Sequence, residues 1–149
     1  MRAVVQRVDM ARINVNNQLV ASISKGMLIF LGIERGDEFR DADYLVDKVS
    51  NLRIFEDESG KMNKSLPEVS GEMLVVSQFT LFGDCRKGRR PSFISAEEPE
   101  QSKKLYSYFI HEVSKKISVV KTGIFQAMMK VELVNDGPVT LLLDSRKLF

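Results

Sequence analysis

The N-terminal third of the chain consists of short apolar runs that are rich in β-branched side chains. These runs read "AVVQRV", "ARINVN", "LVASIS" and "MLIFLGI", and Asn16-Asn17 and Lys25-Gly26 punctuate them. Alternation of apolar and polar residues is typical of strands that bury one face, and Asn and Gly favour the tight turns between strands. The pattern predicts three or four strands in this region, at least two of them in hairpins.

Two later segments have a helical period instead. In "DEFRDADYLVDKVSNLRIF", apolar residues fall on one helical face and acidic residues gather at the start, where the helix dipole favours anions. In the second segment apolar residues recur every four positions, at Leu105, Phe109, Val113 and Ile117. Proline suits the first position of a helix, so this helix is predicted to run from about Pro99 to Ile117.

The remaining apolar segments again predict strands. "RIFED" and "EMLVVSQFTLF" are two of them, and "QAMMKVELVNDGPVTLLLDS" is interpreted as two strands joined at "NDGP". Because strands dominate and other strands separate the two helices, the class is predicted to be α+β. We expect a single compact domain over residues 1–149, with a mixed or antiparallel sheet or a partial barrel.

The composition is that of an ordinary globular protein, with 44% hydrophobic and 28% charged residues. No apolar run is long enough to span a membrane, and the charged start "MRAVVQRVDMARINV" does not resemble a signal peptide. The single cysteine cannot form an internal disulfide, so an oxidising compartment is not needed. A cytoplasmic protein with no membrane association is the expectation.

The distribution of charge is more informative than the net charge of +2. Basic residues gather in "CRKGRR", whereas acidic residues gather in "EDES", "DEFRDADY" and "SAEEPE". One basic loop on a nearly neutral protein indicates a local contact with an anion rather than a surface that coats DNA. The chain contains neither of the common glycine-rich phosphate-binding motifs.

Side chains that usually perform catalysis are scarce. Cys85 is a candidate nucleophile because adjacent cations favour its thiolate, but a cysteine hydrolase normally also needs a base. His111 is the only histidine, and its spacing from Phe109 and Val113 turns it away from the apolar stripe of its helix, toward solvent. With one histidine and one cysteine, a typical zinc site is nearly excluded, and we expect no metal and no cofactor.

Two further segments combine small polar residues with glycine or a strand end. They are Ser77, Gln78 and Thr80 in "SQFT", and the turn "NDGPVT" from Asn135 to Thr140. Taken as patterns, both are compatible with an ordinary strand end and an ordinary turn. The alternative is a site that works through positioned backbone N–H groups, which stabilise an oxyanion without a side-chain acid or base. Such a site requires a labile bond, for example that of an activated ester.

Several long strings resemble the D-aminoacyl-tRNA deacylase family. They are "LVVSQFTL", "DCRKGRRPSF" and "LVNDGPVT", supported by "RIFEDESGKMNKSL" and the opening "AVVQRV", and they follow the family's order along nearly the whole chain. The resemblance implies a compact homodimeric α+β fold with active sites at the dimer interface. It also implies hydrolysis of the ester that joins a D-amino acid, or mischarged glycine, to the 3′ end of tRNA.

The resemblance assigns roles to both polar segments. Ser77, Gln78, Phe79 and Thr80 are expected to line the pocket, with the amides of Phe79 and Thr80 as the oxyanion hole and the 2′-hydroxyl of the terminal adenosine assisting the attacking water. Gly137 and Pro138 match the family's Gly-cis-Pro motif, which one subunit inserts into the active site of the other. There the motif is expected to exclude L side chains, a form of selection by steric rejection.

The resemblance also implies a second set of binding residues. "TGIFQAMM" is similar to the family's pocket segment and makes Phe125 and Met129 candidates for substrate binding, although Gln126 stands where a small residue is expected. The basic loop is expected to bind the tRNA 3′ end through Arg86, Lys87, Arg89 and Arg90.

Four alternatives remain open at this point. The Thr80 hydroxyl is a rival nucleophile, although no base is visible to activate it. A nucleic-acid-binding module without catalysis and a cysteine-dependent esterase using Cys85 are rival functions. A related subclass carries the Gly-Pro motif in the trans form, and the sequence does not reveal the isomer.

Overall fold

Strand β1 (Arg2–Val15) organises the sheet, because its two halves have different neighbours. The computed structural model describes residues 1–149. The first half of β1 pairs with β3 (Gly26–Gly32) and the second half pairs with β2 (Gln18–Ile23), and both pairings are antiparallel. The predicted runs "AVVQRV" and "ARINVN" are therefore one continuous strand. Asn16 and Asn17 have φ angles of 51° and 63°, as the tight turn of the β1–β2 hairpin requires.

Parallel strands complete the sheet and make it mixed. Strand β6 (Glu72–Ser77) runs parallel to β3, and β7 (Val120–Thr122) runs parallel to β6. A small separate sheet joins β4 (Phe55–Glu56) to β5 (Met62–Lys64). Short 3-10 turns, η1 (Pro67–Val69) and η2 (Phe79–Phe82), precede and follow β6. The prediction of an α+β protein with a mixed sheet is confirmed.

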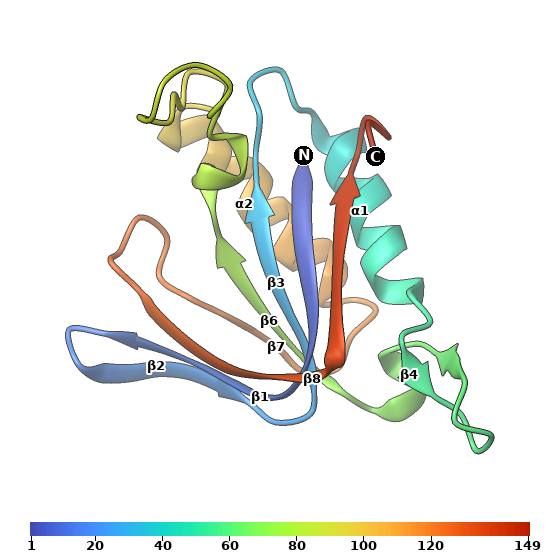
Figure 1. Ribbon diagram of the computed structural model, residues 1–149. Helices are drawn as coiled ribbons and strands as arrows, with labels where there is room; N and C mark the ends of the chain where they lie inside the picture. The colour runs from blue at the N-terminus through green and yellow to red at the C-terminus, as the bar shows by residue number, and fades with distance from the viewer.

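Helices α1 (Phe39–Asn51) and α2 (Pro99–Val113) pack against one face of the sheet (Figure 1). Their predicted apolar faces are buried there, with Leu45 and Phe109 fully inaccessible to solvent. Helix α2 begins at Pro99, as predicted, but ends at Val113 rather than Ile117. Ile117 nevertheless remains buried, because its N–H bonds to the Val113 carbonyl at 2.9 Å in the turn that follows the helix. No helix in the structure is long and apolar enough to cross a membrane.

The sheet bends strongly, so that the far halves of β1, β2 and β8 (Lys130–Asp144) swing away from β3 and β6 (Figure 1). A second apolar cluster, which includes Ile13, Leu28 and Leu74, fills the inside of this bend. The single compact domain thus resembles an incompletely closed barrel with both helices on one side.

Strand β8 corrects the prediction of two strands joined by a turn. It pairs with β1 on both sides of the "NDGP" segment, with Thr140 opposite Gln6 and Asn135 opposite Val8. The residues between them form a bulge, because β1 continues unbroken on the other side of the ladder. The other edge of β8 has no partner strand.

Candidate functional site

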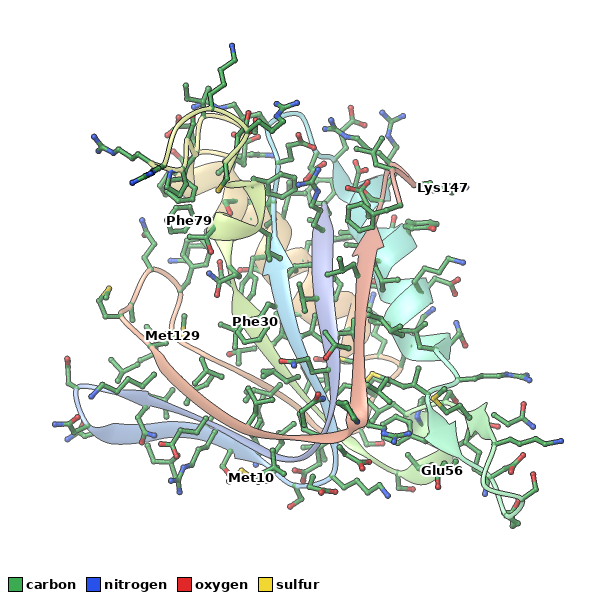
Figure 2. All side chains as sticks on the ribbon, in the orientation of Figure 1. Met10, Phe30, Glu56, Phe79, Met129 and Lys147 are labelled. Carbon is green, nitrogen blue, oxygen red and sulfur yellow. The ribbon has the colours of Figure 1, made fainter.

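A cavity of about 710 Å³ opens beside the end of β6. It is lined by residues of three segments, within the ranges 76–80, 93–102 and 125–131, together with Arg35. Figure 2 shows Phe79 and Met129 on segments that face each other across this region. All six of the predicted pocket residues outside the Gly-Pro motif are among the residues that line it: Ser77, Gln78, Phe79, Thr80, Phe125 and Met129.

The inner wall forms where a buried strand changes abruptly into a turn. Residues 73–76 are fully buried, and the Gln78 N–H donates to the Leu31 carbonyl at 2.8 Å, which ends the ladder with β3. The chain then enters η2, in which Phe79 and Thr80 occupy the first two positions. The first N–H groups of a helical turn have no partner inside the turn, so these two donors are left for a ligand. The Gln78 side-chain amide donates to the Thr80 hydroxyl and fixes its orientation.

The opposite wall is built from apolar side chains on an irregular segment. Phe125 packs on Tyr106 with ring centroids 5.7 Å apart, and Met129 lies over Gly123, where any added Cβ would be 2.4 Å from the Met129 sulfur. Gln126 has a φ of 64°, a conformation that favours glycine or asparagine, which gives a physical reason to expect a small residue there. Tyr106 donates to the Val75 carbonyl at 2.9 Å, and burial raises its pKa well above the ordinary value, so it stays a neutral structural group.

Three charged side chains line the cavity, those of Arg35, Glu97 and Glu98. Arg35 forms an ion pair with Glu98, and the carboxylate of Glu97 accepts the Glu98 N–H at 2.8 Å. The lining contains no histidine, cysteine, lysine or aspartate. No group of three or more His, Cys, Asp or Glu side chains in the structure is arranged to hold a metal ion. The ionisable side chains that line the cavity are therefore those of Arg35, Glu97 and Glu98.

The conventional candidates lie elsewhere. Cys85 is exposed and belongs to a separate polar hollow of about 630 Å³ that also contains Arg2 and Asp84. His111 lies on the solvent side of α2, 3.8 Å from the Glu112 carboxylate, as its spacing predicted. Neither residue lines the cavity.

The basic loop is held at its base by a short antiparallel bridge between Asp84 and Ser92, with N–O distances of 2.7 and 2.9 Å. Arg86 points back to this bridge and binds both carboxylate oxygens of Asp84, and these hydrogen bonds lower the pKa of Asp84 to about 2. The charge of Arg86 is thus already compensated. Lys87, Arg89 and Arg90 form no ion pair and remain exposed.

Gly137 and Pro138 do not line the cavity of their own chain. They lie exposed in the bulge of β8, the peptide bond between them is cis, and Gly137 has a φ of 118°. Asn135 ties the bulge to β1, since its side-chain amide donates to the carbonyls of Arg7 and Val139 at 2.9 and 3.1 Å.

Arg7 is the functional candidate that the sequence did not reveal. Its side chain is buried below the bulge and donates to the Ile54 carbonyl at 2.6 Å. Its Nε lies 2.9 Å from Asp136 Oδ2, close enough for an ion pair although not aligned for a hydrogen bond. The only signal in the sequence was an arginine within a mostly apolar run. The same pattern occurs where an alternating strand exposes an arginine to solvent.

Known proteins resemble this chain over all or nearly all of its length. The family model described as D-Tyr-tRNA(Tyr) deacylase matches residues 4–144 of this chain. The chain belongs to this deacylase family. It is 73% identical over 149 residues to a D-aminoacyl-tRNA deacylase of Syntrophus aciditrophicus, and 56% identical over 150 residues to one of Thermosipho melanesiensis, with 100% of both chains covered in each case.

Two solved structures have the same fold as this member of the deacylase family. The c-Myc DNA Unwinding Element Binding Protein is 41% identical and superposes with a TM-score of 0.92, covering 97% of this chain and 98% of its own. A probable eukaryotic D-amino acid tRNA deacylase is 21% identical with a TM-score of 0.80, covering 96% and 98%, which is a likeness of fold.

Proposed function

We propose that this protein is a D-aminoacyl-tRNA deacylase that hydrolyses the ester between a D-amino acid, or mischarged glycine, and the 3′ end of tRNA. The observation that carries the proposal is the pair of residues Phe79 and Thr80, whose N–H groups lack a partner within their turn and which line a cavity without histidine, cysteine or lysine. An aminoacyl ester is activated enough to react in such a site. Membership of the deacylase family supports the same substrate class.

In the proposed reaction, water attacks the ester carbonyl and the oxyanion that forms accepts hydrogen bonds from the amides of Phe79 and Thr80. Removing one such donor typically costs about 10²- to 10³-fold in rate. The 2′-hydroxyl of the terminal adenosine positions or activates the water, and the 3′-oxygen leaves with a proton as free tRNA. The Thr80 hydroxyl is less suited to be a nucleophile, because its hydrogen-bond partner is an amide and not a base.

The proposal includes a homodimer in which Gly137 and Pro138 of one subunit close the cavity of the other. The motif is exposed and lies outside the cavity of its own chain. The same strand leaves one edge unpaired and exposes Val134 (51%) and Leu142 (60%), features that favour burial against a partner. Light scattering at micromolar concentration should give the mass of two chains, and a mass near one chain would contradict this part of the proposal.

The deciding experiment compares hydrolysis of D-Tyr-tRNA and L-Tyr-tRNA, with and without alkylation of Cys85. We expect rapid hydrolysis of the D substrate only, unaffected by alkylation. Loss of activity on alkylation would favour the cysteine esterase instead. Binding of tRNA or DNA without turnover would favour a nucleic-acid-binding module, which the name of one structural relative makes worth testing. A single deacylase domain over residues 1–149 and a cytoplasmic location belong to the same proposal.

A further inference from the structure

An exposed aromatic pair stands between the cavity and the basic loop. The rings of Phe79 and Phe93 meet edge to face, with centroids 5.2 Å apart and planes 68° apart. Phe79 is 55% exposed and Phe93 38% exposed, although both line the cavity. An edge-to-face pair covers only one ring face, so the remaining faces are available to a flat ligand.

The position of Phe93 is set by its neighbours rather than by burial. It follows Ser92, whose bridge to Asp84 closes the basic loop, so the ring stands at the foot of that loop. Gly83 makes room for it, because a Cβ at that position would come within 2.9 Å of the Phe93 ring. The ring is therefore held in place while much of its surface faces solvent.

The charges around this ring are arranged asymmetrically. The loop beside Phe93 carries Lys87, Arg89 and Arg90 without ion-pair partners, whereas the charge of Glu98 in the cavity lining is compensated by Arg35. A negatively charged strand that leaves the cavity is attracted along the loop. Aromatic faces next to unpaired cations are the usual means of holding single-stranded nucleic acid, because every base can stack and every nucleotide carries a phosphate.

We propose that Phe93 is a stacking platform for the base of the nucleotide immediately before the terminal adenosine of tRNA, while the three unpaired cations of the loop hold the adjoining phosphates. This inference rests on the proposed function, because that function places the esterified adenosine in the cavity. The base before it is then the first one outside the mouth, where Phe93 is exposed. A role for Phe93 in the chemical step is not needed, since the oxyanion donors belong to Phe79 and Thr80.

A binding cycle tests the platform independently of catalysis. The probes are a short acceptor-stem RNA hairpin with an intact single-stranded 3′ end, and the same RNA with an abasic nucleotide before the terminal adenosine. We expect the wild-type protein to bind the intact RNA about tenfold more tightly than the abasic RNA. Phe93→Leu keeps the bulk of the side chain but removes the ring, so it should bind both RNAs equally weakly. Phe93→Tyr should restore the difference. Ile94→Ala alters an adjacent side chain that is 78% exposed and should keep the difference.

Kinetics separate this proposal from the proposed function. With D-Tyr-tRNA, Phe93→Leu should lower kcat/KM about tenfold through KM, whereas with D-tyrosyl-adenosine it should act like the wild type. Equal losses of kcat/KM on both substrates would overturn the platform. So would losses of RNA affinity from Phe93→Leu and from the abasic nucleotide that simply multiply when the two changes are combined. So would a weaker dimer in Phe93→Leu, since the ring would then be an interface residue. If the wild type hydrolyses neither substrate, the proposed function fails, while the binding cycle still decides the role of Phe93.

Discussion

Replacing Gly137 with alanine tests whether the bulge of β8 takes part in the reaction. A Cβ at this position would lie 2.8 Å from Arg7 Nη2 and 2.9 Å from Val139 Cγ2, closer than real Cβ atoms approach their neighbours. The φ of 118° is also a conformation that L side chains rarely adopt. Arg7 cannot simply withdraw, because its Nη1 donates to the Ile54 carbonyl at 2.6 Å in a buried site. The bulge itself therefore has to move.

The size of the effect follows from these contacts. An alanine in a sparsely populated backbone region costs about 1–3 kcal/mol of stability, which a folded domain tolerates. A displacement of about 1 Å in a group that positions the substrate costs about 100-fold in rate. We expect kcat/KM for D-Tyr-tRNA to fall by about 100-fold in Gly137→Ala. Hydrolysis of L-Tyr-tRNA should not appear, because the substitution removes no group from the bulge that is proposed to exclude L side chains.

Gly60→Ala is the matched control for backbone strain. Gly60 has a φ of 75° in the turn between β4 and β5, and a Cβ there would meet nothing within 4 Å. It carries the backbone strain without the clash, so it should lose no more thermal stability than Gly137→Ala and should keep wild-type deacylation. Single-turnover rates and thermal unfolding of both variants decide the matter. Equal activity in the two variants, or new activity of Gly137→Ala on L-Tyr-tRNA, would refute the role assigned to the bulge.

Three further predictions concern side chains outside the cavity. Cys85→Ala and His111→Ala should each retain most deacylase activity, and a loss of about a thousandfold in a folded variant would restore side-chain catalysis. Replacing Arg89 and Arg90 with alanine should weaken tRNA binding and reduce its log–log salt slope by roughly one unit per lost phosphate contact. An unchanged slope would mean that these cations only face solvent. The pKa of Asp57 is lowered to about 2 by hydrogen bonds, first from a neighbouring serine hydroxyl and then from backbone amides of its own hairpin. This contribution is present above the unfolded pKa of about 3.9 and is lost as the pH falls through about 2, so an NMR titration of the hairpin amides should have its midpoint near 2 rather than 4.

The parts of the fold that depend on neighbouring residues were predictable from the sequence. The apolar stripes of α1 and α2 have a helical period, but the predicted strand "EMLVVSQFTLF" ends at Ser77 and its last four residues form the turn η2. The end of α2 was wrong by four residues, because a following turn buries Ile117 just as another helical turn would. The pairing of Arg86 with Asp84 could have been suspected from their spacing, but the basic run hid it.

The parts that depend on distant residues were not predictable in this way. Whether "NDGP" is a turn or a bulge depends on β1, which lies far away in the sequence and stays continuous beside it. The structural role of Arg7 depends on the Ile54 carbonyl and on Asp136, neither of which is near it along the chain. The local pattern of apolar residues predicts which face of a strand or helix is buried. It does not predict which distant polar group will pair with a polar residue that interrupts the pattern.

In the proposed mechanism, stabilisation of the oxyanion and selection between enantiomers fall to different parts of the site. In the proposed mechanism, the backbone amides of Phe79 and Thr80 donate to the carbonyl oxygen and stabilise the same oxyanion for either enantiomer of an aminoacyl ester. Chirality is decided one atom away, at the α-carbon, so selection needs a separate wall whose position is fixed to a fraction of an ångström. Within one chain the bulge at Gly137 and Pro138 has the required exposure and is braced by Arg7 and Asn135, yet it lies outside the cavity. In the proposed dimer, the core of one subunit holds the wall in place, and the wall closes the cavity of the other subunit. In this proposal, changes in the turn after β6 act on the oxyanion of either enantiomer, whereas changes in the bulge act at the α-carbon, as the expected loss of D-Tyr-tRNA hydrolysis in Gly137→Ala illustrates.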